Sequence, residues 1–449
     1  EAVTNLHQRL ADLTCPQLIV AVGDIALQAL RGHGGILKWR GSVVVYEPLS
    51  TRLIPTVHPA ALFRDPSLER RCIADWQKIA QEWRDPSEAP QIQHHIAPEW
   101  RDVQNYRRIV EREVTLPKVE RRRLTIDIET PRRMKEVKAL TPKLKKPTTK
   151  KIPGTPFIGC IGFALNNDES LTIPTMPGYW NERGIHMNDV WEEIRLICES
   201  ALEKTLQNGF FDTFYLLRDR AVNKALGRGI RVRNWKHDTL AKHHVLEASE
   251  DHDLGYLNSR FGRVPFWKDD GKQAGDLRAI PLDLEKWWRY NGIDCTETHF
   301  IDEQIDAVMT PEQQAFYTAH YQQCFAPILQ MMEDGICVDE EKRVQRYAEL
   351  RTRLDKLRTK INATANTDLM GEKSISATKL KRWLYDDLKL PKQFAKNARK
   401  EKVESAGEIQ LRKLMLRFPS NEQLQKVGRL VLKFRRLDKL SSFFVDKLV

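Results

Sequence analysis

The residues whose types and spacing could do chemistry lie in the middle of the chain: Asp127, Glu129, Asp212, Tyr290 and Asp294. The segment LTIDIE at 124–129 alternates apolar and polar residues, as in a half-buried strand, so its two acidic side chains are expected to project from one face. The tyrosine and the last aspartate are four residues apart in a stretch predicted to be helical from near Pro281, and therefore share a helical face. Asp212 follows a strand-like segment at 205–207 and is expected near a helix N-terminus.

Carboxylates that converge on one point repel each other unless cations neutralise them. Hard oxygen ligands select Mg²⁺ or Mn²⁺. Two such ions, about 3.5–4 Å apart, support in-line attack at a phosphodiester. The residue types and their order therefore predict metal-dependent phosphodiester hydrolysis. Any one of these short acidic patterns alone is more often part of a solvated face or a helix cap. The prediction therefore rests on their occurrence together in one chain.

The three motifs Asp127/Glu129, Asn208/Asp212 and Tyr290/Asp294 resemble, in this order, the DEDDy branch of the DnaQ-like 3′→5′ exonucleases. The segment HDTL at 237–240 is similar to an Asp-Thr segment that the family carries between its second and third motifs. The resemblance implies a ribonuclease H-like α/β fold. It also implies two Mg²⁺ (or Mn²⁺) ions bridged by Asp127, with Glu129 and Asp294 completing one site and Asp212 serving the other through water.

The resemblance also assigns roles to side chains around the metal ligands. It implies that Tyr290, with Glu129, orients the attacking water, and that Thr130 and Asn208 touch the terminal nucleotide. Phe266 is a candidate for stacking on a displaced base, with a core phenylalanine as the alternative.

The amino-acid composition indicates the general class of the protein. The 449 residues suggest three domains, and 41% hydrophobic with 30% charged residues is typical of a globular protein. The longest apolar runs, such as 18–22, are too short to span a membrane, so no membrane partner is expected. The seven cysteines are scattered without a CxxC pair, which favours reduced thiols in a cytoplasmic setting (the host cytoplasm for a viral protein). The net charge of +12 favours a polyanionic partner.

Much of the basic excess falls on residues 131–151, which carry nine Lys or Arg and one Glu. Pro131, Pro142, Pro147 and the later Pro153 predict a loop here and disfavour a helix or a strand. The segment is predicted to be an exposed insertion in the exonuclease domain, which is expected over 121–310. It would either guide single-stranded DNA toward the carboxylates or simply be solvated.

The first 85 residues show a different pattern. Residues 17–30 predict a buried strand, a glycine turn and an amphipathic helix, followed by a strand ending at His58 and a helix at 68–83. With KWRG at 38–41 and HPA at 58–60, this region resembles the carboxyl half of the uracil-DNA glycosylase superfamily. The family's water-activating Gly-Glu-x-Pro-Gly segment is absent and Ala60 replaces its loop serine, so a structural or DNA-positioning role is expected. Residues 86–120 are predicted to be a linker.

Residues 311–449 are predicted to be helical. The segment 325–339 resembles the connection between exonuclease and polymerase in family A DNA polymerases, and 374–391 and 430–446 resemble that family's thumb. Leu350, Leu354, Leu357 and Ile361 keep helical spacing between them. The segment 391–413 has seven Lys or Arg against three Glu, as in a thumb tip that grips duplex phosphates, or in a solvated loop.

The palm and fingers of such a polymerase are not found, since the chain has no Tyr-Gly dipeptide and its one His-Asp-Thr belongs to the nuclease motifs. The chain is therefore expected to be the proofreading exonuclease portion of a larger, bacteriophage-type family A polymerase. It would act on single-stranded 3′ ends and contact primer–template duplex, with other replication proteins as further partners. The alternatives are an RNase D-like exoribonuclease, which shares the three motifs, and a catalytically silent DNA-binding platform.

Overall fold

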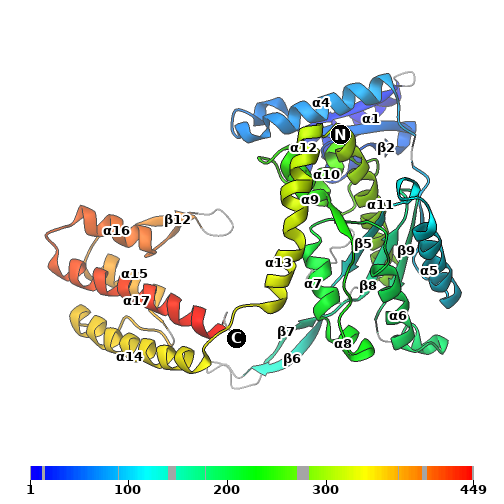
Figure 1. Cartoon of the computed structure of the whole chain (residues 1–449). Coiled ribbons are helices and arrows are strands. Elements are labelled where there is room, and N and C mark those ends of the chain that lie inside the picture. Colours follow the sequence, from blue (N-terminus) through cyan, green and yellow to red (C-terminus); the bar gives the residue numbers. More distant parts are fainter. Residues whose placement is uncertain are drawn as a thin grey trace. The chain divides into compact units, whose positions relative to one another are not determined.

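The structure is a computed structural model that describes residues 2–12, 16–88, 90–139, 148–176, 178–269, 283–372, 374–396 and 402–446 (Figure 1). The chain divides into two compact units, Glu1–Asp334 and Gly335–Val449, and each is described by itself. Both helices and strands are present, in agreement with the predicted α/β class. Within the described ranges, no helix combines the length and the apolar character that crossing a membrane requires.

The first unit opens with a small three-stranded sheet in the order β1-β3-β2, in which β3 pairs parallel with β1 and antiparallel with β2. The predicted strand, glycine turn and helix are present. Gly23 at the turn has a left-handed φ of 90°. A Cβ atom at this position would also lie 3.0 Å from the Cβ of His58, so the turn requires glycine. The elements are α1 (Ala2–Ala11), β1 (Leu18–Val22), α2 (Asp24–Arg31), α3 (Ile36–Trp39), β2 (Val44–Tyr46), β3 (Thr51–Thr56) and α4 (Glu69–Arg84).

The KWRG segment attaches this sheet to the rest of the unit. Arg40, 1% exposed, donates from Nη2 to Asp75 Oδ1 at 2.7 Å and from Nη1 to Ser259 Oγ at 2.8 Å. A Cβ on Gly41 would stand 2.3 Å from the Ser259 carbonyl oxygen, so only glycine permits this approach. Arg71 adds an ion pair with Glu250 at 3.0 Å. The N-terminal segment therefore packs firmly on α10 (Leu254–Phe261).

The main sheet has six strands in the order β11-β10-β5-β8-β9-β4. The central strand β5 pairs parallel with β10 and antiparallel with β8, with Asp127 opposite Gly162 and Glu129 opposite Cys160. β9 is antiparallel to β8, while the outer strands β11 and β4 are parallel to their neighbours. The strands are β4 (Gln93–His95), β5 (Leu124–Glu129), β8 (Cys160–Ala164), β9 (Glu169–Pro174), β10 (Lys204–Leu206) and β11 (Trp235–Asp238).

Helix α11 crosses β5, β8 and β9. The helix can lie this close to β8 because residue 162 is a glycine. A Cβ atom there would lie 2.4 Å from Asn291 Oδ1 and 2.6 Å from Cys295 Sγ. The fully buried Cys295 fills this contact next to the motif aspartate Asp294. The helices after β9 are α6 (Met187–Cys198), α7 (Phe210–Arg218), α8 (Arg220–Leu226), α9 (Thr239–Leu246), α10, α11 (Leu284–Val308), α12 (Pro311–Phe316) and α13 (Gln322–Asp334).

Residues 86–120, predicted to be a linker, include the edge strand β4 and helix α5 (Trp100–Thr115). A capping box between Glu99 and Asp102 starts α5. Val103 and Val110, seven residues apart on one helical face, are buried in the core that also holds the residues of β5 and β8. These elements thus complete the sheet and its cover.

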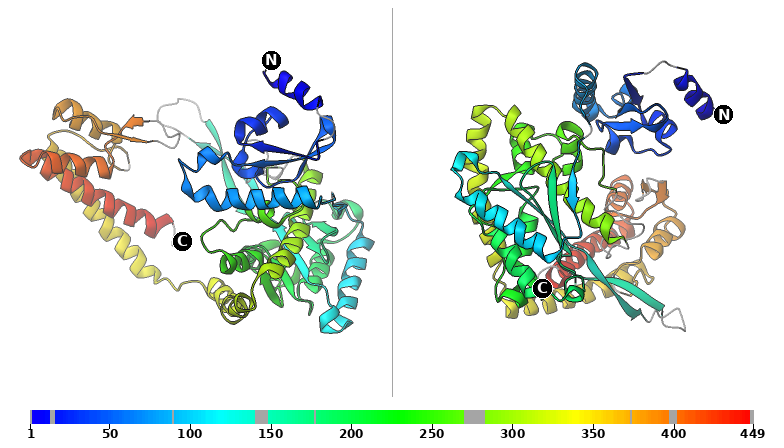
Figure 2. Two further views of the ribbon diagram at one scale, coloured as in Figure 1. Left: turned by 90° about the horizontal axis from the view of Figure 1, so that it is seen from above. Right: turned by 90° about the vertical axis from the view of Figure 1, so that its right-hand side faces the viewer.

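Residues 131–151 were predicted to form a loop and no strand, and this prediction was wrong for the residues that the structure describes. Strands β6 (Arg132–Ala139) and β7 (Thr148–Pro156) form an antiparallel pair running from Arg132 opposite Pro156 to Ala139 opposite Thr148. Figure 2 shows this ribbon extending from the body of the first unit. Pro153 and Pro156 lie in β7 opposite Met134 and Arg132, and proline is tolerated in a two-stranded ribbon because each of its strands is an edge strand. Pro142 and Pro147 lie outside the described residues.

The second unit is mainly helical, as predicted. Its core lies between α14 and α17, where Leu354, Ile361, Val427 and Val431 are buried. The elements are α14 (Glu340–Ala365), α15 (Ala377–Arg382), a further helical turn Trp383–Asp387, β12 (Phe394–Lys396), β13 (Lys402–Glu404), α16 (Glu408–Arg417) and α17 (Glu422–Asp446). The division after Asp334 leaves α12 and α13 in the first unit, where Phe325 stacks on Trp235 with ring centroids 4.2 Å apart.

Candidate active site

The predicted carboxylates of β5 project together. Ile126 and Ile128 are 1% and 4% exposed, whereas the alternate residues Asp127 and Glu129 are half-buried. One oxygen from each of these carboxylates and one from Asp294 all lie within 4.8 Å of one another. Strand β5 and helix α11 therefore bring two of the three motifs to one point, and the resulting group could hold a metal ion.

Asp212 lies beside this group, at the first turn of α7. It is 4% exposed, and its Oδ1 accepts a hydrogen bond of 3.0 Å from the backbone N–H of Ile128. That bond fixes the carboxylate next to the strand between Asp127 and Glu129. All four predicted acidic residues are thus gathered around the end of β5.

The pKa values of Asp127, Glu129 and Asp212 are raised. Burial raises the pKa of Asp127 to about 8, and the negative charge of Asp294 acts in the same direction. Burial, followed by the charge of Asp127, raises the pKa of Glu129 and of Asp212 well above the usual range. A group of acids that resists ionisation in this way is one that cations would stabilise in its charged form.

Two residues that sequence reasoning missed hold the site in place. Asn291 Nδ2 donates to Asp127 Oδ2 at 2.7 Å and to the Asp127 carbonyl oxygen at 3.2 Å. Lys268 Nζ lies 2.6 Å from Asp294 Oδ2, 2.7 Å from Oδ1 and 3.1 Å from the Tyr290 hydroxyl. For Asn291, the sequence carried a signal in its position one helical turn before Asp294. Lys268 stands in an irregular segment with no periodicity that could have indicated it.

Tyr290 lies half-buried among these charges. Burial raises its pKa above the usual range, and the carboxylates of Asp294 and Glu129 add to the shift. The phenol therefore stays protonated near neutral pH and can donate a hydrogen bond. The indole of Trp267, which sequence reasoning also missed, donates from Nε1 to Asp294 Oδ1 at 2.6 Å, the oxygen that Lys268 contacts as well.

The three predicted nucleotide-contacting residues occupy different positions. Thr130 directly follows β5 and is half-buried. Asn208 adopts a left-handed φ of 57° in the turn from β10 to α7, and Asp238 accepts from the following Gly209 N–H at 2.8 Å. Phe266 lies against the N-terminal segment, with its ring centroid 5.6 Å from that of Trp39.

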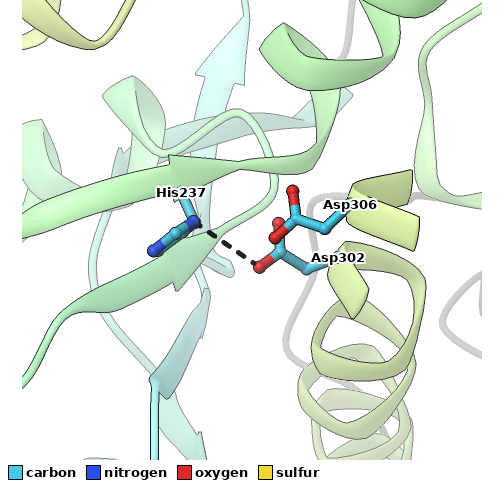
Figure 3. Close-up of side chains that lie close together, drawn as sticks. All are labelled: His237, Asp302 and Asp306. Carbon is cyan, nitrogen blue, oxygen red and sulfur yellow. Dashed lines mark ion pairs between the residues drawn. The ribbon is translucent and has the colours of Figure 1, made fainter. Parts of the chain in front are cut away.

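A second acidic group, His237 with Asp302 and Asp306, lies elsewhere in the first unit (Figure 3). Lys242 Nζ contacts Asp302 at 2.6 Å and Asp306 at 2.7 Å, and Arg123 Nη1 contacts them at 2.5 and 2.7 Å. Burial alone would raise the pKa of Asp302, but Lys242 and His237 hold it well below the usual range. Because protein cations already neutralise it, this group is a structural ion-pair network.

The similarity of this chain to known proteins is low. No family model and no curated protein matches the chain. Among solved structures it is similar to the POL domain of Pol1 from M. smegmatis in complex with DNA primer-template and dNTP, with 11% identity and a TM-score of 0.45. The match covers 80% of this chain, which spans about half (51%) of that structure.

Proposed function

We propose that this chain is a 3′→5′ exonuclease of the DEDDy type, the proofreading portion of a family A DNA polymerase. It would hydrolyse the terminal phosphodiester of single-stranded DNA. The observation that carries the proposal is the group formed by Asp127, Glu129 and Asp294, whose oxygens lie within 4.8 Å of one another. Asp212 and Tyr290, the remaining members of the motif set, stand beside it.

The donor set fits Mg²⁺ or Mn²⁺. It consists of carboxylates that are half-buried, in Asp127 and Glu129, or buried, in Asp212 and Asp294, and oxygen is the ligand that these ions prefer. Asp127 would bridge two ions, Glu129 and Asp294 would complete one site, and Asp212 would serve the other. When bound, the ions would supply charge neutralisation and lower the pKa of water.

The chain's own side chains would orient the reaction. The protonated Tyr290 can donate to a water beside Glu129, and Asn291 holds Asp127 through two hydrogen bonds. Lys268 offers an ammonium group next to Asp294, where negative charge accumulates during attack on a phosphate. Thr130 and Asn208 remain the proposed contacts to the terminal nucleotide.

The arrangement of the sheet supports a ribonuclease H-like domain, because the acidic strand β5 is central and antiparallel to β8 but parallel to β10. The tight packing of Arg40 on Ser259 supports a structural role for the glycosylase-like segment. The helices of the second unit are proposed to be thumb-like, with the basic segment 391–413 contacting duplex DNA. The hairpin of β6 and β7 is proposed to guide single strands.

The first test is activity on matched single strands. The chain with Mg²⁺ is expected to release mononucleotides stepwise from the 3′ end of a 5′-labelled DNA oligonucleotide, and to stop when Mg²⁺ is chelated. An RNA strand of the same sequence should be degraded more slowly. Preferential degradation of RNA would favour the RNase D-like alternative, and the absence of both activities would favour a silent DNA-binding platform.

Tyr290→Phe is expected to reduce the rate of mononucleotide release about 100-fold, less than loss of a metal ligand. The variant keeps the ring between Lys268 and the helix but loses one hydrogen-bond donor, and such donors contribute on this scale. Initial rates at saturating DNA would measure the effect. An unchanged rate would remove Tyr290 from the account of water orientation.

A further inference from the structure

A hollow of about 510 Å³ lies between α7, the start of α8 and the segment 156–158 that precedes β8. Its walls include the aromatic side chains of Phe157, Phe214 and Tyr215 and the guanidinium-bearing residues Arg218 and Arg220. Its volume is within the range of about 300–1,000 Å³ that is common for ligand sites. None of the three sequence motifs includes these residues.

Two connections tie the hollow to the candidate active site. Tyr215 follows Asp212 by three residues on α7, so the two are neighbours on that helix. On the opposite wall, the backbone N–H of Phe157 donates to the Pro131 carbonyl at 3.1 Å, and that of Gly159 donates to the Glu129 carbonyl at 2.8 Å. One wall of the hollow is therefore the helix that carries Asp212, and another is a segment that is hydrogen-bonded to the end of the strand that carries Glu129.

The charge of the hollow is positive. Its one acidic wall residue, Asp219, is 7% exposed, and its carboxylate accepts from the N–H groups of Ala221 at 2.7 Å and Ile158 at 3.3 Å. Arg218 and Arg220 are exposed and form no ion pair with any residue that the structure describes. Two unpaired guanidinium groups thus stand beside an aromatic surface.

The same two arginines also line a second hollow of about 560 Å³. There they are joined by Arg228 and Arg231, which pair with Glu199 and Glu333 at 2.9 and 3.0 Å. The arginines therefore continue from the aromatic hollow past the end of α8, but the two beyond it are paired with acids. The two unpaired arginines, Arg218 and Arg220, beside an aromatic wall match a strand of phosphates with unstacked bases.

We propose that the aromatic hollow is a subsite for one internal nucleotide of single-stranded DNA, 5′ of the nucleotide that is removed. Phe214 and Tyr215 stack on its base, and Arg218 and Arg220 bind the adjoining phosphates. This role rests on the proposed exonuclease function, since it places the strand leading to the carboxylates. The subsite would hold a strand whose 3′ end has separated from its template.

The phosphate contacts are tested by salt dependence. Binding of a labelled oligothymidylate to the full chain is measured in EDTA, which prevents cleavage, over a range of salt concentrations. Arg218→Ala/Arg220→Ala should lower the slope of log Kd against log salt by about 1.4, since each phosphate contact on a single strand contributes about 0.7. Arg101→Ala/Arg112→Ala, the matched control, removes two exposed arginines from α5 and should leave the slope unchanged.

The base contact is tested by moving one abasic site along the oligonucleotide. Wild type should bind at least about fivefold more weakly when the abasic site falls at one or two internal positions, because stacking on an aromatic side chain contributes at this level. Phe214→Leu/Tyr215→Leu should bind all positions alike, whereas Phe316→Leu, a change of an exposed phenylalanine on α12, should keep the wild-type pattern. Circular dichroism would establish that the variants are folded.

Equal salt slopes for the two arginine double variants would overturn the proposal. So would a wild-type affinity that does not depend on the abasic position, even if the arginine slopes differ. Both measurements are made without metal ions, so failure of Mg²⁺-dependent degradation would remove the proposed function and leave them interpretable. Normal degradation with a flat abasic scan would remove the subsite alone.

Discussion

Asp127→Ala is expected to lower Mg²⁺-dependent mononucleotide release from single-stranded DNA by about 10³-fold or more. Asp127 contributes to the close group with Glu129 and Asp294 and is the proposed bridging ligand. Metal ions stabilise developing charge by several kcal/mol, and each 1.36 kcal/mol corresponds to a tenfold change in rate. Asp294→Ala should act similarly, because its carboxylate is the only one that α11 brings into this group.

The matched control is Asp189→Ala, which makes the same chemical change at an exposed position of α6. It should degrade DNA at the wild-type rate. Rates are measured on the same 5′-labelled strand with excess Mg²⁺, and thermal unfolding verifies that each variant is folded. Wild-type activity in Asp127→Ala would refute the assignment of the metal ligands.

The second large effect is expected in stability without any substrate. In EDTA, the wild-type protein should become less stable as the pH rises from about 5 to about 8. Burial raises the pKa of Asp127 from the ordinary 3.8 to about 8, so in this window the folded chain binds a proton that the unfolded chain releases. Stability then falls with rising pH, by up to about 1.4 kcal/mol per pH unit for one proton, reduced by solvent screening of the half-exposed group.

Two changes should reduce this dependence. Asp127→Asn cannot ionise, so its melting temperature in EDTA should fall less between pH 5 and 8 than that of wild type. Excess Mg²⁺ at pH 8 should raise the melting temperature of wild type, because binding to the folded state stabilises it, and should raise that of the variant less. Thermal unfolding would measure both, with Asp189→Asn as control. Identical pH profiles for wild type and Asp127→Asn would contradict the charge arrangement.

The parts that the sequence predicted well are those with strong local patterns. The alternation at 124–129 predicted β5, and the four-residue spacing of Tyr290 and Asp294 predicted one face of α11. Leu354 and Ile361 are buried along α14, as their spacing indicated. In these segments the local preference and the burial pattern agree, so a single sequence was sufficient.

The parts that sequence reasoning missed depend on contacts between distant segments. Lys268 reaches Asp294 from an irregular segment, and Arg40 reaches Ser259 across 219 positions of the chain. The ribbon of β6 and β7 is stabilised by cross-strand pairing, which includes Pro153 although proline suggested a loop. Asn291 was not identified because an asparagine in a helix has many ordinary roles, and only its 2.7 Å bond to Asp127 reveals this one.

The central claim is that the acidic group around β5 binds two divalent cations. The most direct measurement is the anomalous scattering of Mn²⁺ in crystals of the full chain soaked with this ion and a mononucleotide product. The account predicts two peaks about 3.5–4 Å apart, both next to Asp127, with Glu129 and Asp294 at one and Asp212 near the other. No peak at these carboxylates, or Mn²⁺ only at His237, Asp302 and Asp306, would contradict it.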